Sequence, residues 1–354
     1  MAGQKRELNL RDAAAELDAE QDALAEAQKL HGLRRANDRL TAQLKQRDAE
    51  LAEALGRLAL LEHIDSLDPE PPRWLQPAKP RPADTMVVAM LSDCHWDEIV
   101  HAADVAGVNS FNREIAVKRT RQWAEQVAAL PDTGPAANIK GAVVMLGGDL
   151  TCGFIDTLHL VSSDDTTLGS LLFWSEQAAA ALSLIADAYG RVHVPAVIGN
   201  HGRMTAKKRT SGAAADSTDY HLCRLIRRLL ADDKRFTWQI DEAPDAEFPV
   251  FGQRHVLTHG DSTSGGGGIG GVFPPIMRMV ARKQQRQAAL GRPFDHLWLG
   301  HFHQVIYGPG WTANGSLKGY DGYAASHNFP AERPAQVAAF VDRDGIAWRT
   351  AIRL

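Results

Sequence analysis

The sequence predicts a mixed α/β domain that follows an N-terminal helix of the coiled-coil type. The first 65 residues contain no proline and no aromatic residue, and their leucines recur with a spacing of seven. From Thr85 onward, short apolar strand-like runs alternate with helix-like segments, as in α/β domains. We therefore expect a helical coiled coil over 1–65, a proline-rich linker over 66–85 and a catalytic domain over 86–354.

The N-terminal helix has the pattern of a self-associating coiled coil. From Leu30, eight of the ten a and d positions of the heptad are apolar. Asn37 occupies an a position, where a buried amide favours a parallel dimer because only its twin can satisfy it. We expect a homodimer through residues 30–61; the alternative is a single long helix that folds back onto the following domain. The a positions are Leu30, Asn37, Leu44, Leu51 and Leu58, and the d positions are Leu33, Leu40, Arg47, Ala54 and Leu61.

The linker and the elements after it follow from proline content and apolar runs. Six prolines between Pro69 and Pro82 predict a stiff, extended spacer. Beyond the spacer, short apolar runs predict strands and the longer segments between them predict helices. We expect strands at 85–91, 141–146, 192–198, 254–258 and 296–300, helices at 113–130, 168–189, 219–230 and 273–290, and a hairpin over 336–354.

Composition narrows the class of protein. The 39 basic and 43 acidic residues leave a net charge of −4, which excludes a generally basic nucleic-acid coat but not a local basic groove. The first residues form no apolar signal segment, and no apolar run approaches the ~18 residues of a membrane-spanning helix. Three cysteines are too few and too scattered for a disulfide framework or a Cys-x-x-Cys zinc site. We expect an intracellular, cytoplasmic protein with no membrane partner.

Polar residues of metal-binding type follow five of the predicted strands. The carboxyl ends of strands gather functional groups in open α/β sheets. Carboxylates, imidazoles and an amide, without a thiolate, are ligands that suit Mn²⁺, Fe²⁺ or Zn²⁺. The number of these groups is too large for one ion and fits two ions that share a bridging ligand. In Leu297–Val305 (LWLGHFHQV), two histidines two residues apart would point to the same side of an extended chain. The strand-end residues are Asp93, His95, Asp149, Asn200, His201, His259, His301 and His303.

This set of motifs resembles the calcineurin-like metallophosphoesterase family. The patterns D-x-H, GGD, GNH, a strand-end His and G-H-x-H occur in the family's order between about Met86 and Asn314. The resemblance implies a four-layer αββα sandwich of two mixed sheets flanked by helices. It also implies two divalent ions, Mn²⁺ first, with Fe²⁺, Zn²⁺ and Mg²⁺ as alternatives. By resemblance, Asp93, His95 and His303 hold one ion, Asn200, His259 and His301 hold the other, and Asp149 bridges them.

The resemblance further implies an activity, the hydrolysis of phosphodiester bonds by a metal-bound hydroxide. His201 would give a proton to the leaving oxygen or stabilise the transition state, and Arg203 would bind the phosphoryl group. The run Ala313–Ala324 (ANGSLKGYDGYA) resembles NGS and GYD runs of phosphoesterases encoded by bacteriophages, some of them labelled DNA-repair nucleases. We therefore expect nucleic acid, DNA first, as substrate. The alternatives are a phosphomonoesterase or cyclic-nucleotide phosphodiesterase on the same site, and a coiled-coil scaffold protein with a relic domain.

Two positions depart from the family pattern. Gly202 follows GNH where the family often has an acidic residue, so a carboxylate that orients His201 would come from elsewhere, for example Asp97. Cys152 stands three places after the bridging Asp149, where relatives that cleave DNA often carry a histidine. These departures bear on the role of His201 and on the details of a nuclease mechanism.

Two further polar residues near the motifs are expected to be structural. Cys94 lies between two predicted ligands, but in an extended chain its side chain would point away from them. His255 shares a strand face with His259, yet four residues of strand separate the two by roughly 13 Å, which is too far for one ion.

Overall fold

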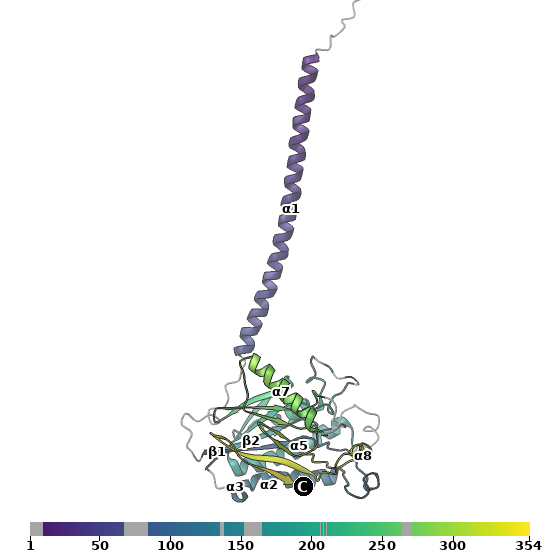
Figure 1. Ribbon diagram of the computed structural model, residues 1–354, viewed down its shortest axis with the longest axis vertical. Coiled ribbons are helices and arrows are strands. Elements are labelled where there is room, and N and C mark those ends of the chain that lie inside the picture. The colour runs from purple at the N-terminus through teal and green to yellow at the C-terminus, as the bar shows by residue number, and fades with distance from the viewer. Residues whose placement is uncertain are drawn as a thin grey trace, which may run out of the picture. The chain divides into compact units, whose positions relative to one another are not determined.

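The computed structural model describes residues 10–66, 84–134, 138–151, 165–205, 207, 209, 211–263 and 271–354 (Figure 1). The chain divides into two compact units, Met1–Glu70 and Pro71–Leu354. Most of the predicted linker, residues 67–83, lies outside the described residues, as does Cys152.

The first unit contains one long helix, α1, over Leu10–Ser66. The helix ends one residue after the predicted limit of 65, and the predicted start at residue 1 lies outside the described residues. Leucines at five of the predicted a and d positions are 51–64% exposed and form an apolar stripe along the helix. They are Leu30, Leu33, Leu40, Leu44 and Leu51; the side chains of Leu58 and Leu61 lie outside the described residues. Pairing with a second copy stays a prediction.

The second unit contains a six-stranded mixed sheet in the order β11-β10-β1-β2-β3-β4. Strands β1 to β4 run parallel, and the C-terminal hairpin β10–β11 adds to β1 in antiparallel fashion, as the predicted hairpin requires. The bounds are β1 Asp84–Leu91, β2 Asn138–Leu146, β3 Val192–Ala196, β4 Phe236–Ile240, β10 Ala335–Asp342 and β11 Gly345–Arg353.

A second mixed sheet has five strands in the order β5-β6-β7-β9-β8. Its central strands β6, β7 and β9 are parallel, whereas β5 and β8 pair antiparallel at the two edges. The bounds are β5 Asp245–Val250, β6 Gln253–Thr258, β7 His296–Leu299, β8 Ile306–Gly308 and β9 Trp311–Ala313. The prediction found β6 and β7 but missed the short strands β4, β5, β8 and β9, which lack a long apolar run.

The helices and the two sheets stack in four layers. Val87, Ala89 and Leu91 of β1 pack in the core formed with α2 (Arg113–Ala128), α5 (Thr167–Tyr189) and α6 (Thr218–Leu229). The alternate residues Met86 and Met90 pack against the second sheet, in a separate core. Helix α7 (Phe273–Ala289) covers the outer face of the second sheet and lies on the opposite side of the strands from α2 (Figure 1). The predicted four-layer αββα sandwich is confirmed.

The described residues of the second unit also contain three short helical elements. They are η1 (Ala102–Val105), α3 (Leu130–Thr133) and α8 (Gly322–Ser326). Helix α2 ends at Ala128 and α3 begins at Leu130, so the predicted single helix over 113–130 is divided near its end.

Helix α5 is apolar enough to need comment. Among the described helices, it alone passes a test of length and composition for a membrane span. Half of its apolar window is buried inside the unit, and Leu171, Trp174, Leu182 and Ile185 lie in the helix-side core. The segment also contains Glu176 and Gln177, so it is not an uninterrupted apolar run. These contacts are those of the core helix of an α/β layer.

Candidate metal centre

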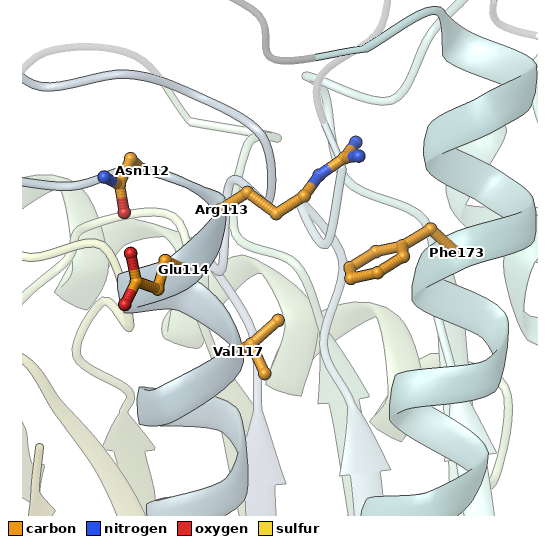
Figure 2. A pocket seen from close by; sticks show the side chains of 5 residues that line it. All are labelled: Asn112, Arg113, Glu114, Val117 and Phe173. Carbon is orange, nitrogen blue, oxygen red and sulfur yellow. The ribbon is translucent and has the colours of Figure 1, made fainter.

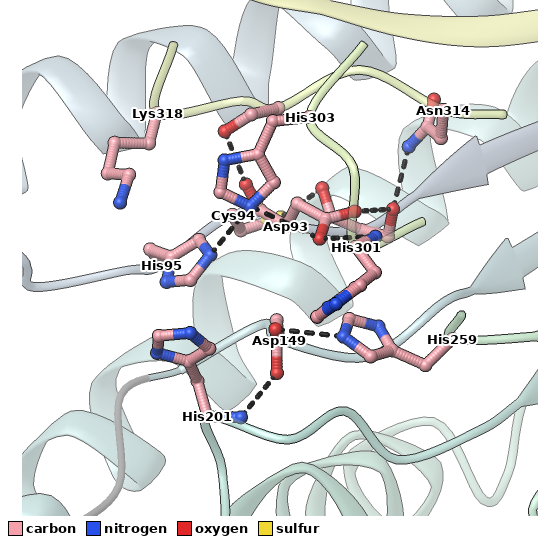
Figure 3. A network of polar contacts seen from close by, with 12 residues as sticks. Asp93, Cys94, His95, Asp149, His201, His259, His301, His303, Asn314 and Lys318 are labelled. Carbon is pink, nitrogen blue, oxygen red and sulfur yellow. Dashed lines mark hydrogen bonds and ion pairs between the residues drawn. The ribbon is translucent and has the colours of Figure 1, made fainter. Parts of the chain in front are cut away.

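The predicted site residues lie just beyond strand ends of both sheets (Figure 3). Asp93 and His95 follow β1, Asp149 follows β2, and Asn200 and His201 follow β3. His259 follows β6, and His301 and His303 follow β7. The two sheets pack face to face with these carboxyl ends together, so five loops from two sheets meet in one place.

The backbone at this place is left-handed at five of the seven predicted ligands. Asp93, His95 and Asp149 have φ of 52°, 46° and 50°, and His301 and His303 have φ of 71° and 56°. Asp and His enter this region more readily than most residues, but each still costs on the order of 1 kcal/mol. The prediction that His301 and His303 lie on an extended chain is therefore wrong, because β7 ends at Leu299 and both residues are left-handed. Their rings lie in different groups, as the resemblance implied.

The first group comprises Asp93, His95 and His303, whose candidate ligand atoms lie within 4.8 Å of one another. Nε2 of His303 is 3.4 Å from Oδ1 of Asp93 and 3.2 Å from Nε2 of His95. Asp93 and His95 are buried, whereas the His303 side chain is 30% exposed, so the group opens to solvent on the His303 side.

The second group comprises Asp149, His259 and His301, again within 4.8 Å. Nε2 of His259 is 2.9 Å from Oδ2 of Asp149 and 3.2 Å from Oδ1 of Asn200, which places Asn200 in the same group. The structure thus brings all seven predicted ligands together. Asp149 also belongs to a third triplet with His95 and His201, so it lies between the two groups, where a bridging ligand would be.

The hydrogen bonds of His259 fix the tautomer of its neutral ring and leave a lone pair that faces other acceptor atoms. Nδ1 of His259 is 2.9 Å from the carbonyl oxygen of Gly147, which can only accept, so Nδ1 carries the proton of a neutral ring. Nε2 of His259 then points an unshared pair at two acceptor oxygens, from Asp149 and Asn200. Acceptors so arranged need either a proton on Nε2 or a metal ion between them. The donor set therefore fits a metal ion.

The electrostatics point the same way. Burial alone would lower the pKa of His259, but the carboxylates of Asp149 and Asp93 outweigh it and raise the pKa to about 10. His301 behaves differently: burial and the neighbouring His259 lower its pKa to about 4. The centre thus favours positive charge at the carboxylates, and a divalent ion would supply that charge without protonating the ring.

Asp219 is a functional residue that the sequence did not reveal. It lies in the first turn of α6, fully buried, and its carboxylate accepts from the backbone N–H groups of Asp149 (2.9 Å), Leu150 (3.1 Å), Thr151 (3.4 Å) and Gly199 (2.9 Å). Burial and the charge of Asp149 raise the pKa of Asp219 to about 6. One carboxylate therefore ties the loop after β2 to the loop after β3. An acidic residue at a helix start was the available signal, but it is common for capping alone.

Glycines next to the ligands make room for carboxylates of the centre itself. A Cβ on Gly199 would lie 2.0 Å from Oδ1 of Asp149, and one on Gly300 would lie 2.4 Å from Oδ2 of Asp93. The glycines of the GNH and GHFH motifs are therefore required by the close approach of two predicted ligands.

His201 lies beside the centre and contacts both groups. Its ring packs edge-on against His95 with centroids 4.6 Å apart, and its backbone N–H donates to Oδ1 of Asp149 at 2.6 Å. Burial lowers the pKa of His201 to about 3, against the opposing effect of Asp149. Asp97 does not orient this ring in the way suggested by the sequence: its Oδ1 accepts from Nε of Arg113 at 2.6 Å.

Arg203 lies on the same loop as Asn200, with Nη1 3.4 Å from the Asn200 carbonyl oxygen. Its Nε is buried and finds no hydrogen-bond acceptor among the described residues. An unsatisfied guanidinium N–H beside a metal-binding loop is suited to an anionic group. Phosphate binding by Arg203 stays a prediction.

The two residues expected to be structural make structural contacts. Cys94 is buried, and its Sγ approaches the Ser92 carbonyl oxygen at 3.7 Å. Burial raises the pKa of this thiol well above its ordinary value, so it is a poor metal ligand. His255 stacks on Phe248 and Trp298 and accepts from Nε1 of Trp298 at 3.0 Å.

A surface hollow between α2 and α5 lies outside this centre (Figure 2). Its volume is about 620 Å³, and the described residues that line it are Asn112, Arg113, Glu114, Val117 and Phe173. Arg113, its cationic residue, is already paired with Asp97 and Asp165. We assign the chemistry to the strand-end cluster, because there seven ligand-type side chains converge around the carboxylates of Asp93 and Asp149.

The chain matches no protein-family model and no curated protein. Solved structures similar to it include Vps29 complexed with zinc from Entamoeba histolytica, at 12% identity and a TM-score of 0.31 over 76% of this chain and 100% of that chain. A predicted phosphoesterase from Streptococcus pneumoniae is 10% identical, with a TM-score of 0.28 over 75% of this chain and 98% of that chain. A putative 5'-nucleotidase from Staphylococcus aureus is 9% identical, with a TM-score of 0.28 over 76% of this chain and 54% of that chain. At these identities and TM-scores the likeness carries no information on what this chain binds or hydrolyses.

Proposed function

We propose that this chain is a metallophosphoesterase that holds two divalent ions and hydrolyses phosphodiester bonds in nucleic acid, DNA first. The observation that carries the proposal is the convergence of seven ligand-type side chains in two groups with Asp149 between them. Asp93 and Asp149 place two carboxylates among these groups, and the raised pKa of His259 supports a site that favours positive charge. The family resemblance puts Mn²⁺ first. Carboxylate, imidazole and amide ligands without a thiolate also suit Fe²⁺ and Zn²⁺, and four imidazoles make Mg²⁺ the least suited ion.

Each residue has a role in this proposal. Asp93, His95 and His303 would hold one ion, Asn200, His259 and His301 the other, and Asp149 both. Bound ions would withdraw charge from phosphoryl oxygens and lower the pKa of a water molecule. The protein fixes the ligands by strained loops that Asp219 ties together.

The state of His201 distinguishes its two suggested roles. With a pKa near 3 the ring is neutral at pH 7, and bound cations would lower the pKa further. A neutral imidazole donates a hydrogen bond to a phosphoryl oxygen or leaving oxygen but holds no extra proton to release. His201 therefore acts as a transition-state hydrogen-bond donor, and Arg203 neutralises the phosphoryl charge from the same loop.

Two observations support a polymeric diester as the substrate. The cluster opens to solvent at His303, so a long chain can reach it without entering an enclosed pocket. The run Ala313–Ala324 also has the NGS and GYD patterns noted above. Among the basic residues of α7, Lys283 and Arg286 contribute little to such binding, because both bind Asp245.

The test combines metal content with a substrate panel. Full-length protein is stripped with chelator, reloaded with Mn²⁺ or Zn²⁺, and assayed on single-stranded DNA, duplex DNA, bis-p-nitrophenyl phosphate, a cyclic nucleotide and p-nitrophenyl phosphate. We expect two ions per chain and metal-dependent cleavage of DNA and the aryl diester. Cleavage of the monoester or the cyclic nucleotide alone would overturn the nucleic-acid substrate. Failure to bind a transition metal would overturn the hydrolase and favour the scaffold alternative.

We also propose that α1 pairs in parallel with α1 of a second copy. The exposed leucines of its a and d positions are worth roughly 1.5–3 kcal/mol each when fully buried. The test is light scattering of the full-length chain. We expect the wild-type chain to be a dimer and the double variant Leu40→Lys/Leu44→Lys to be a monomer. The control variant Ala42→Lys/Ala49→Lys, which changes f positions on the outer face of the helix, should stay a dimer. A wild-type monomer would end the proposal.

A further inference from the structure

The segment Asn314–Asp321 (NGSLKGYD), called here the 314–321 segment, contacts one of the two ligand groups and has no role in the proposed chemistry. Nδ2 of Asn314 donates to Oγ of Ser92 (2.8 Å), which donates to Oδ2 of Asp93 (2.5 Å). Oγ of Ser316 and the backbone N–H of Leu317 both donate to the carbonyl oxygen of Asp93, at 2.9 and 3.2 Å. The first half of the segment therefore fixes Asp93.

The second half of the segment reaches His95 through a buried ion pair. Lys318 is 2% exposed, and its Nζ donates to Oε1 of Glu98 (2.8 Å) and to Oδ2 of Asp321 (2.5 Å). The other oxygen of Glu98, Oε2, is 3.3 Å from Nδ1 of His95. Figure 3 shows Lys318 on the His95 side of the cluster and Asn314 on the other. Lys318, Glu98 and His95 thus form a continuous chain of contacts.

The backbone around Lys318 is held from helix α2 and from the loop before it. Nη1 of Arg119 donates to the carbonyl oxygens of Leu317 (3.0 Å) and Lys318 (2.6 Å). Nδ2 of Asn109 donates to those of Lys318 (3.0 Å) and Tyr320 (2.8 Å). Gly319 has φ +81°, and a Cβ there would lie 2.7 Å from Cγ of Pro334. The position of the ammonium is therefore fixed by the fold.

We propose that Lys318 and Glu98 are positioning residues for the ion held by Asp93, His95 and His303, and that they leave the other ion unaffected. The inference rests on the proposed function. A carboxylate that accepts from Nδ1 of a histidine fixes the ring and turns Nε2 toward the metal. A buried carboxylate in turn needs a counter-charge, which Lys318 supplies from a position too buried to reach substrate.

The sign of the effect separates positioning from simple electrostatics. An ammonium near a cation site repels the cation, so its replacement by an isosteric apolar residue would tighten metal binding if only charge mattered. If Lys318 acts by holding Glu98 against His95, the same replacement weakens binding of one ion. Lys318→Met therefore gives opposite results under the two explanations.

The experiment is calorimetric titration of metal-stripped, full-length protein with Mn²⁺, for wild type, Lys318→Met, Glu98→Gln and the double variant. We expect two sites in wild type, and a Kd about 10–100-fold higher at one site in each single variant, with the other site unchanged. The double variant should be no worse than the poorer single variant, because both residues act on the same ring. Circular dichroism and thermal unfolding show whether each variant is folded. If Lys318→Met does not fold, the Mn²⁺ affinity of the nearly isosteric Glu98→Gln variant tests the proposal.

The matched control is Lys283→Met. Lys283 also forms a buried ion pair, with Nζ 2.5 Å from Oδ1 of Asp245, but its described partners do not include a predicted ligand. It should lose thermal stability and bind both ions like wild type. Unchanged or tighter binding of both ions in Glu98→Gln and Lys318→Met would overturn the inference alone. A wild-type chain that binds no Mn²⁺ would overturn the proposed function, and the inference with it.

Discussion

Buried histidines occur in two settings in this molecule, inside strands and just beyond strand ends, and their partners differ. His193, His255 and His296 lie within β3, β6 and β7 and contact Thr237, Trp298 and Thr312. All three partners are neutral, and burial lowers the pKa of these histidines to about 4, 4 and 2. They are neutral, packed side chains of the core.

The strand-end histidines instead face carboxylates. His259 meets Asp149, His303 meets Asp93 and His95 meets Glu98. At His259 the carboxylates overcome burial and reverse the direction of the pKa shift. The difference is one of backbone position: a strand directs side chains into a packed layer, whereas the chain beyond its end, left-handed at His95, His301 and His303, turns them toward one another. Burial alone therefore does not distinguish a ligand from a core histidine.

The largest expected effect comes from Asp149→Asn. It removes the negative charge shared by both groups, so both ions should bind more weakly and turnover should fall by more than the ~10–100-fold typical of an outer-partner loss. Metal content by mass spectrometry and steady-state kinetics on the aryl diester measure this. Wild-type metal content and rate would mean that Asp149 is not the bridging ligand.

His201→Ala should lower kcat by roughly 10²-fold or more while both ions stay bound. Because the pKa of His201 lies near 3, the ring is neutral from pH 5 to 9, and its loss should reduce kcat evenly across that range. The readout is a kcat–pH profile of wild type and variant. A wild-type profile with an alkaline limb that disappears in His201→Ala would show instead that His201 is a protonated acid.

Asp219→Asn tests the tie between the loops after β2 and β3. The amide of Asn has one oxygen to accept from the four backbone N–H donors, and its own NH₂ group would face the donors that the oxygen does not reach. The free energy of unfolding should therefore fall by about 2 kcal/mol. We expect metal affinity to fall about 10-fold as Asp149 loses its fixed backbone. Denaturant unfolding and Mn²⁺ titration measure the two effects. Unchanged metal affinity in a destabilised variant would limit Asp219 to a structural role.

His255→Phe should have the smallest effect on activity. The stacking with Phe248 and Trp298 is kept, but Nε1 of Trp298 loses its acceptor, at a cost of about 1–3 kcal/mol. Metal content and kcat should stay within about twofold of wild type. Loss of a metal ion in this variant would contradict the separation of the two histidine settings.

Much of the centre could be predicted from sequence because the ligands occupy short motifs at strand ends. The alternation of apolar runs locates β1, β2, β3, β6 and β7, and each is followed within a few residues by Asp, Asn or His. The short edge strands β4, β5 and β8 carry no comparable apolar signal, and their pairing depends on neighbours far along the chain.

By itself, the sequence determined which residue types stand at the strand ends, the helical character of α1 and the place of β1 as an apolar strand. Only the tertiary structure decided that Asp219, Glu98 and Lys318 support the centre, and that the backbone turns left-handed at His301 and His303. The physical reason is the distance along the chain over which each interaction acts. Periodicity and strand-end motifs are local properties, whereas a buried carboxylate gains its role from N–H groups, imidazoles and ammonium groups up to 220 residues away.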